Sequence, residues 1–97
     1  MEKIVRLNDK IRNVFDLVKE INFTYHNLKL DKEVEYDRER KCVNIYINGV
    51  KQYYAISFRE NGSISYISPK IETYIFKWLY SFWVCNYKFK FETGEKK

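Results

Sequence analysis

The chain has 97 residues, of which 45% are hydrophobic and 32% are charged, with a formal net charge of +5. These values predict one small folded domain over residues 1–97 with a modest core, and they argue against a disordered chain. The positive charge favours acidic partners such as nucleic acid or an acidic protein, without choosing between them. The N-terminus shows no apolar signal-peptide core, and the longest apolar stretch, near 71–87, is shorter than the ~20 residues that a membrane span needs. We therefore expect a cytoplasmic protein.

Residues that could carry chemistry are few. Cys42 and Cys85 fall in different predicted elements and are expected to be free thiols. His26 is the only histidine, and no acid or nucleophile near it in the sequence suggests a catalytic pair, so we expect a surface or packing role. The chain shows no glycine-rich phosphate loop and no metal-ligand spacing. An enzyme is the least expected class, and no cofactor or metal is predicted.

The N-terminal part predicts a helix over residues 2–22, because apolar residues recur at heptad spacing. These residues are Ile4, Leu7, Ile11, Val14, Val18 and Ile21. Asn8 and Asp9 offer an alternative cap for a shorter helix that begins near residue 9. Residues 23–32 are ambiguous between a short strand and a packed loop.

Residues 33–40 alternate between two kinds of side chain, which is the pattern of a strand. The carboxylates on one side are Glu33, Glu35, Asp37 and Glu39. A charged edge strand that discourages edge-to-edge pairing is the first interpretation. A row of carboxylates that engages a basic groove is the sharper alternative.

A hairpin is predicted around Asn48–Gly49, because a type I′ turn needs positive φ at both central residues. Its strands are 42–47 and 50–58. The expected pairs are Ile47 with Val50, Ile45 with Gln52 and Val43 with Tyr54. One apolar face would then collect Val43, Ile45, Ile47, Val50, Tyr54, Ile56 and Phe58.

A second hairpin is predicted at residues 60–62, with Gly62 in the left-handed conformation. A three-residue loop pairs Phe58 with Ile64 and Ile56 with Tyr66, which keeps the apolar residues on one face. Ile67 is expected to end this strand.

The closing stretch, residues 68–91, holds both tryptophans and predicts a helix that is apolar on most of its faces. Ser68 is expected to cap it and Pro69 to occupy its first turn. The helix is expected to end near Asn86. Residues 87–92 alternate apolar and charged side chains, so they favour a strand or an extended segment, and 93–97 form a frayed tail. The predicted fold class is α+β, with an N-terminal helix, an antiparallel three- to four-stranded meander sheet and a C-terminal aromatic helix.

In size and element order the chain resembles small phage-encoded inhibitors of the anti-CRISPR type. The helix at 2–22, the two hairpins and the aromatic helix carry this resemblance, and no specific motif does. It implies a phage or mobile-element protein that inhibits a bacterial defence protein or nucleoprotein. Many such inhibitors are acidic mimics of DNA, whereas this chain is basic, so no functional residue is transferred.

Three functional hypotheses follow. The first is a non-enzymatic binding protein whose aromatic helix contacts a host protein or nucleoprotein. The residues expected to contact this partner are Phe76, Tyr80, Trp83, Lys88 and Lys90. The second is a small nucleic-acid-binding module that uses Tyr46, Lys51 and Tyr53 on one sheet face. The third is a homodimer that buries residues 68–86 against a second copy.

Overall fold

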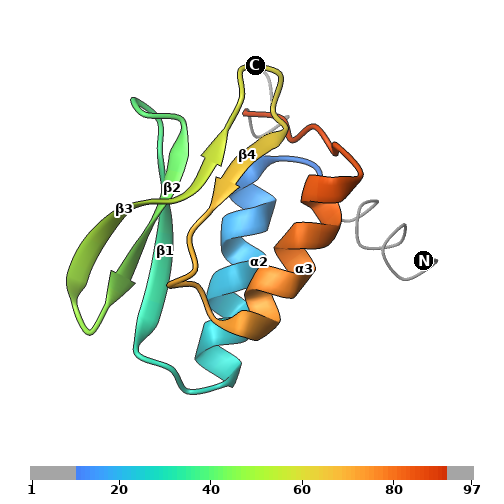
Figure 1. Cartoon of the computed structure of the whole chain (residues 1–97). Helices are drawn as coiled ribbons and strands as arrows, with labels where there is room; N and C mark the ends of the chain where they lie inside the picture. Colours follow the sequence, from blue (N-terminus) through green and yellow to red (C-terminus); the bar gives the residue numbers. More distant parts are fainter. Residues whose placement is uncertain (1–10, 92–97) are drawn as a thin grey trace, which may run out of the picture.

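A computed structural model describes residues 11–91 as one layer of sheet and one layer of helices (Figure 1). The elements, in chain order, are α2 Val14–Asn27, β1 Lys32–Asp37, β2 Cys42–Ile47, β3 Val50–Phe58, β4 Ile64–Ile67 and α3 Thr73–Val84. The strands form one antiparallel sheet in the order β1-β2-β3-β4. Both helices pack on the same face of this sheet, α2 against β1 and α3 against β4. The predicted fold class is therefore confirmed.

Helix α2 differs from its predicted bounds. Residues 2–10 of the expected helix lie outside the described residues, as does the alternative cap at Asn8 and Asp9. The helix begins after Asn13, whose side-chain oxygen accepts the Asp16 backbone N–H at 2.8 Å. It continues to Asn27, so a strand or loop from residue 23 is wrong. The reason is that the buried stripe extends one more turn, to the fully buried Tyr25.

The edge strand β1 is protected by a side chain of α2. The Asn22 amide accepts the Val34 backbone N–H at 2.7 Å and donates to the Val34 carbonyl at 3.0 Å. These two bonds occupy the outward backbone groups of Val34 in the way that another strand would. The predicted edge strand is confirmed, but it ends at Asp37. Residues 38–41 form a turn, so Glu39 does not belong to the carboxylate row.

The first hairpin follows the prediction at its turn and departs from it further along. Asn48 and Gly49 have φ values of 52° and 83°, as a type I′ turn needs. The pairs Ile47–Val50 and Ile45–Gln52 are confirmed. The pair Val43–Tyr54 is wrong, because Val43 pairs with Ile56. Residues 53–55 of β3 therefore face the single residue Asn44, which is a β-bulge that removes Tyr54 from the apolar face.

The second hairpin has the expected loop. Gly62 has φ 93°, and the Arg59 N–H donates to the Ser63 carbonyl at 2.8 Å across residues 60–62. The pair Phe58–Ile64 is confirmed, and the strand ends at Ile67 as expected. The pair Ile56–Tyr66 is wrong, because an irregularity at residue 65 pairs Ile56 with Ile67. Tyr66 instead lies opposite Ser57, on the face away from the helices.

Helix α3 begins later than predicted. Ser68 does not cap it, because the Ser68 side-chain oxygen accepts the Lys70 N–H within a turn at 3.1 Å. This turn reverses the chain after β4, so helical geometry starts only at Thr73, with Glu72 as a cap that makes no side-chain bond. The helix ends at Val84, two residues before the expected Asn86.

The segment after α3 is extended, as its alternating pattern predicts. The Lys90 N–H donates to the Arg12 carbonyl at 3.0 Å, and the Val14 N–H donates to the Lys90 carbonyl at 2.9 Å. Phe89 is buried, with its ring 5.2 Å from that of Phe82 and 5.8 Å from that of Phe58. This segment therefore closes the core between the two layers.

Gly62 makes the closest backbone approach to this closing segment. A Cβ at residue 62 would collide with the Phe89 carbonyl oxygen, and the positive φ adds strain. We expect Gly62→Ala to lower the unfolding free energy by about 3–4 kcal/mol. Gly49→Ala is the matched control, because Gly49 shares the positive φ with no atom nearby, and about 1–2 kcal/mol is expected. Urea unfolding of both variants tests this, and equal losses would contradict it.

The hydroxyl group of Tyr25 is buried beside Glu72. The Glu72 backbone is close enough to act on this hydroxyl, but within residues 11–91 no group meets it with the geometry of a hydrogen bond. Burial, as the largest cause, raises the pKa of Tyr25 from 10.0 to about 12. The folded protein therefore favours the neutral form of the Tyr25 hydroxyl.

Tyr25→Phe tests this burial. We expect no loss of unfolding free energy at pH 7 and a gain of up to about 1 kcal/mol, because an unpaired buried hydroxyl is removed. Above pH 10 the unfolded chain ionises at residue 25 before the folded chain does. The wild type should then lose up to about 1.4 kcal/mol more per pH unit than the variant, and this difference should vanish below pH 10. Urea unfolding from pH 8 to 11.5 measures it, and parallel curves would contradict the assignment.

Candidate binding surfaces

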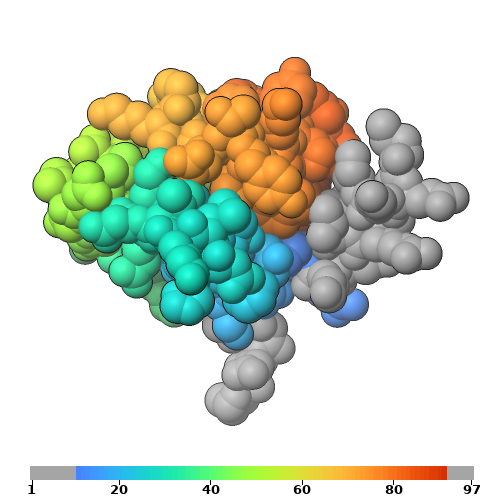
Figure 2. All heavy atoms as spheres, turned by 90° about the horizontal axis from the view of Figure 1, so that it is seen from below, coloured from blue at the N-terminus to red at the C-terminus, as the bar shows by residue number. Residues whose placement is uncertain are grey.

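One flank of α3 gathers the aromatic residues that the sequence analysis singled out. Phe76, Tyr80 and Trp83 recur at helical spacing beside the buried stripe of Ile75, Leu79 and Phe82. The Tyr80 and Trp83 rings meet edge to face with centroids 5.9 Å apart. Tyr80 is 51% exposed, whereas Phe76 and Trp83 are half-buried against the core. Figure 2 shows α3 at the periphery of the molecule.

The charged residues within α3 and the segment that follows it are all basic. From Thr73 to Phe91 the chain contains three lysines and no acidic residue. Lys77 is exposed on the helix itself. Lys88 and Lys90 are exposed on the extended segment, so they lie beyond the C-terminal end of α3 rather than on the Phe76–Tyr80–Trp83 flank. The structure therefore brings together the three aromatic candidates and places the two lysines at the edge of their surface.

The second candidate surface is the sheet face that points away from both helices. Cross-strand pairs place Glu33, Tyr46 and Lys51 in one row, and Glu35 beside Asn44 in the next. A third row holds Asp37, Cys42, Ser57 and Tyr66. We call this the outer face. It contains all three residues of the nucleic-acid hypothesis.

Lys51 is held by groups of the outer face. Its Nζ lies 2.9 Å from a Glu35 carboxylate oxygen, 5.1 Å from the Tyr53 ring centroid and 5.9 Å from that of Tyr46. The hydrogen bond from Lys51 lowers the pKa of Glu35, and Glu35 in turn raises the pKa of Lys51. The structure thus confirms that Tyr46, Lys51 and Tyr53 lie together, and it adds a carboxylate that neutralises the lysine.

A buried amide supports the bulge in β3. Tyr54 has φ 59°, a conformation that is strained for a bulky side chain. The Asn44 side-chain oxygen accepts the Tyr54 backbone N–H at 3.1 Å, and it also accepts the Cys42 thiol at 3.3 Å. The Asn44 side-chain nitrogen donates to Asp37 at 3.2 Å and to Glu35 at 3.4 Å. Asn44 is completely buried, so these bonds satisfy a group that water cannot reach.

The bulge places two consecutive tyrosines on one face. Neighbouring residues of a regular strand point to opposite faces. The rings of Tyr53 and Tyr54 instead lie together, with centroids 6.5 Å apart. Arg40 completes the group, because its guanidinium lies 4.9 Å from the Tyr53 centroid and bonds Asp37 at 3.2 Å.

Sequence reasoning missed Tyr54, Arg40 and Asn44. A regular register counted from the Asn48–Gly49 turn predicts Tyr54 opposite Val43, on the apolar face. Positive φ is usually signalled by glycine or asparagine, and residues 53–55 contain neither. No local signal in the sequence could therefore have located the bulge.

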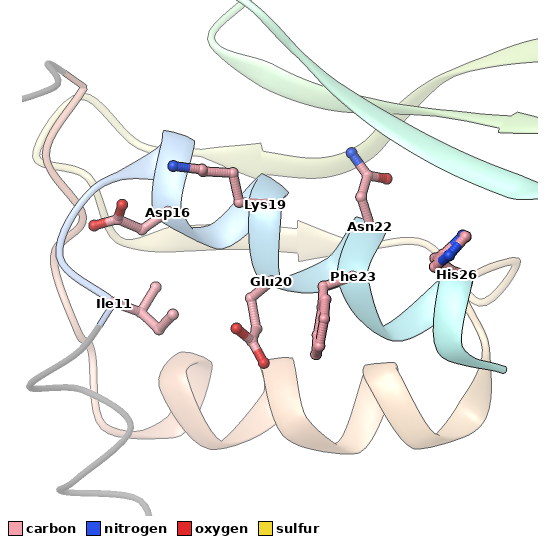
Figure 3. A pocket seen from close by; sticks show the side chains of 7 residues that line it. All are labelled: Ile11, Asp16, Lys19, Glu20, Asn22, Phe23 and His26. Atoms are coloured by element: carbon pink, nitrogen blue, oxygen red, sulfur yellow. The ribbon is translucent and has the colours of Figure 1, made fainter.

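A concave region also lies along α2 (Figure 3). It is lined by Ile11, Asp16, Lys19, Glu20, Asn22, Phe23 and His26. These side chains spread along the whole helix rather than converge on one point. His26 is exposed at one end, and the Asn22 amide is already bonded to Val34. The region offers no set of groups arranged for catalysis.

Other kinds of site find no support among the described residues. Cys42 is buried and Cys85 exposed, and both are free thiols, as predicted. Within residues 11–91, no three His, Cys, Asp or Glu side chains are grouped to hold a metal ion. No helix in the same part of the chain combines the length and the apolar composition that crossing a membrane requires.

No protein-family model, curated protein or solved structure matches this chain. Its surfaces are therefore interpreted from their own residues.

Asn44 carries a stability prediction for the bulge. Asn44→Ala removes the acceptor of the Tyr54 N–H and leaves a small cavity, so we expect a loss of about 2–3 kcal/mol in unfolding free energy. Asn27→Ala, at the exposed end of α2, is the control and should change it by less than about 0.5 kcal/mol. Tyr54→Gly loses the contacts of the tyrosine ring but also removes about 1 kcal/mol of backbone strain, so we expect its unfolding free energy to fall by less than the lost contacts alone would cause. Chemical denaturation measures all three, and a neutral Asn44→Ala variant would contradict the assigned role.

Proposed function

We propose that this chain is a non-enzymatic binding protein that contacts a protein partner through the Phe76–Tyr80–Trp83 flank of α3. The observation that carries this proposal is that Tyr80 is exposed, and Phe76 and Trp83 are only half-buried, on a helix that already buries another stripe in the core. Tyrosine and tryptophan are the residues that most often anchor protein interfaces, because each combines a large apolar ring with one polar group.

The charge around α3 selects among partners. Lys77 on the helix and the two lysines beyond its C-terminal end are complementary to an acidic protein surface. Val84, 62% exposed, and Lys77 lie beside the aromatic flank on the outermost part of the helix. We therefore expect an apolar partner pocket with carboxylates at its rim.

The narrower hypothesis is inhibition of a bacterial defence protein or nucleoprotein. This hypothesis is supported by the resemblance in size and element order to small phage-encoded inhibitors. It makes bacterial defence proteins and nucleoproteins the first partners to test. Purified bacterial defence complexes would be assayed for nuclease activity with and without the chain. The wider proposal of a binding protein does not depend on this outcome.

The nucleic-acid hypothesis has less support from the geometry. Lys51 is paired with Glu35, and three carboxylates of β1 lie on the same face, where they would repel phosphate. A homodimer through α3 remains an alternative occupant of the aromatic flank. Light scattering at high concentration distinguishes it, because a homodimer doubles the measured mass.

The test begins with a photo-crosslinking amino acid at residue 80, and at residue 19 on α2 as a control. A protein that crosslinks only from residue 80 is purified and its affinity is measured. We expect Tyr80→Ala or Trp83→Ala to weaken binding by about 2 kcal/mol, or about thirtyfold. Lys19→Ala should leave the affinity unchanged. Equal affinity for all variants would place the interface elsewhere and refute the proposal.

A further inference from the structure

The outer face of the sheet plays no part in the proposed binding of a protein partner through α3. Four tyrosines lie on it, namely Tyr46, Tyr53, Tyr54 and Tyr66. No helix of the described chain covers them, and Tyr54 and Tyr66 are 46% and 45% exposed. Their ring faces are therefore available to a ligand.

The same face already binds two cations of its own chain in one repeated way. Arg40 lies over the Tyr53 ring and pairs with Asp37. Lys51 lies over the rings of Tyr46 and Tyr53 and pairs with Glu35. In each case a tyrosine ring supplies the cation–π contact and a β1 carboxylate supplies the counter-charge.

The local charge favours a further cation over an anion. The face carries three carboxylates, Glu33, Glu35 and Asp37, against the two cations Lys51 and Arg40. It is therefore negative by one charge on a chain whose net charge is +5. Glu33 is exposed at the end of the row, next to Tyr46. A phosphate would meet this carboxylate row, whereas a guanidinium or ammonium group would find both of the partners that Arg40 and Lys51 use.

We propose that the outer face binds an extended protein segment bearing arginine or lysine, with Tyr54, Tyr66 and Glu33 as the contacts that the chain's own cations leave open. The tyrosines of this face follow adjacent strands, which suits a segment that crosses the strands. The buried Asn44 fixes the Tyr54 backbone, and the Tyr54 ring lies beside that of Tyr53, so the Tyr54 ring is held in place before any ligand arrives. Such preorganisation reduces the ordering that binding requires.

The probe for the test is a short peptide of alternating arginine and glycine, with a glutamate–glycine peptide for comparison. Each is titrated into the full-length, isotope-labelled chain, and amide and tyrosine-ring resonances are followed by NMR. We expect the arginine peptide to shift resonances of β1, β2 and residues 51–54, and the glutamate peptide to shift none of them. Because the whole chain is positive, non-specific attraction cannot produce this pattern.

Matched variants decide which groups act. Tyr54→Ala should weaken binding about fivefold, whereas Tyr54→Phe, which keeps the ring, should bind as the wild type does. Glu33→Gln should weaken binding about two- to threefold. Glu60→Gln makes the same charge change in the exposed β3–β4 loop and should have no effect. Tyr80→Ala should also bind the peptide normally, so a failure of the α3 proposal would not affect this result.

Three results would overturn the inference. The first is the absence of shifts on the outer face at millimolar arginine peptide. The second is an equal loss from Glu33→Gln and Glu60→Gln, which would show attraction to overall charge. The third is a stronger shift of the same resonances by a thymidine oligonucleotide, which would assign the face to nucleic acid. The dispersion of each variant's NMR spectrum shows whether it is folded, and Tyr54→Phe keeps the test valid if Tyr54→Ala is not.

Discussion

The fold depends on Phe89, which joins parts of the chain that the sheet alone would leave apart. Its ring packs against Phe82 of α3, Phe58 of β3 and Tyr87. Its backbone N–H donates to the Gly62 carbonyl at 2.8 Å, so the β3–β4 loop is fixed to the end of the chain. The backbone of the next residue, Lys90, bonds that of Arg12 and Val14 at the start of α2. Because a four-stranded sheet with one uncovered face has little apolar area to bury, this closure of the core by a segment without regular structure is a large part of what stabilises the domain.

Covering only one sheet face has a consequence for function. The two surfaces left to solvent have opposite character. The flank of α3 combines aromatic rings with lysines, and the outer face combines tyrosines with carboxylates. A small protein with two such surfaces on opposite layers could contact two different partners, or two regions of one partner, without the surfaces competing. The bulge at residues 53–55 is the feature that gives the outer face its character, because a regular strand would turn Tyr54 into the core.

Much of the fold could be predicted from residue patterns. The Asn48–Gly49 turn, the Gly62 loop and the extended segment after α3 each depend on local chemistry: positive φ at turn residues, and alternation of apolar and charged side chains. The errors share a cause. The Ser68–Pro69 pair has the residue types of a helix cap. In the structure these residues form the turn by which the chain reverses after β4, and the need for this turn arises from the packing of α3 on the sheet rather than from the local sequence. Likewise, Val43 and Tyr54 were paired because register was extended from the turn without a bulge.

For the candidate surfaces, the sequence by itself determined that the only charged residues from 73 to 91 are lysines. It determined that α3 would present aromatic residues on several faces, because helical spacing fixes which side chains share a flank. It also determined that Tyr46, Lys51 and Tyr53 would share a sheet face, through the two-residue turn. Only the tertiary structure decided that Glu35 neutralises Lys51, that Arg40 lies over the Tyr53 ring, and that Asn44 is buried with its side-chain oxygen on the Tyr54 N–H. These contacts join β1, β2, β3 and the 38–41 turn. The bulge at residues 53–55 brings them together, and these residues include no glycine or asparagine from which the bulge could be predicted.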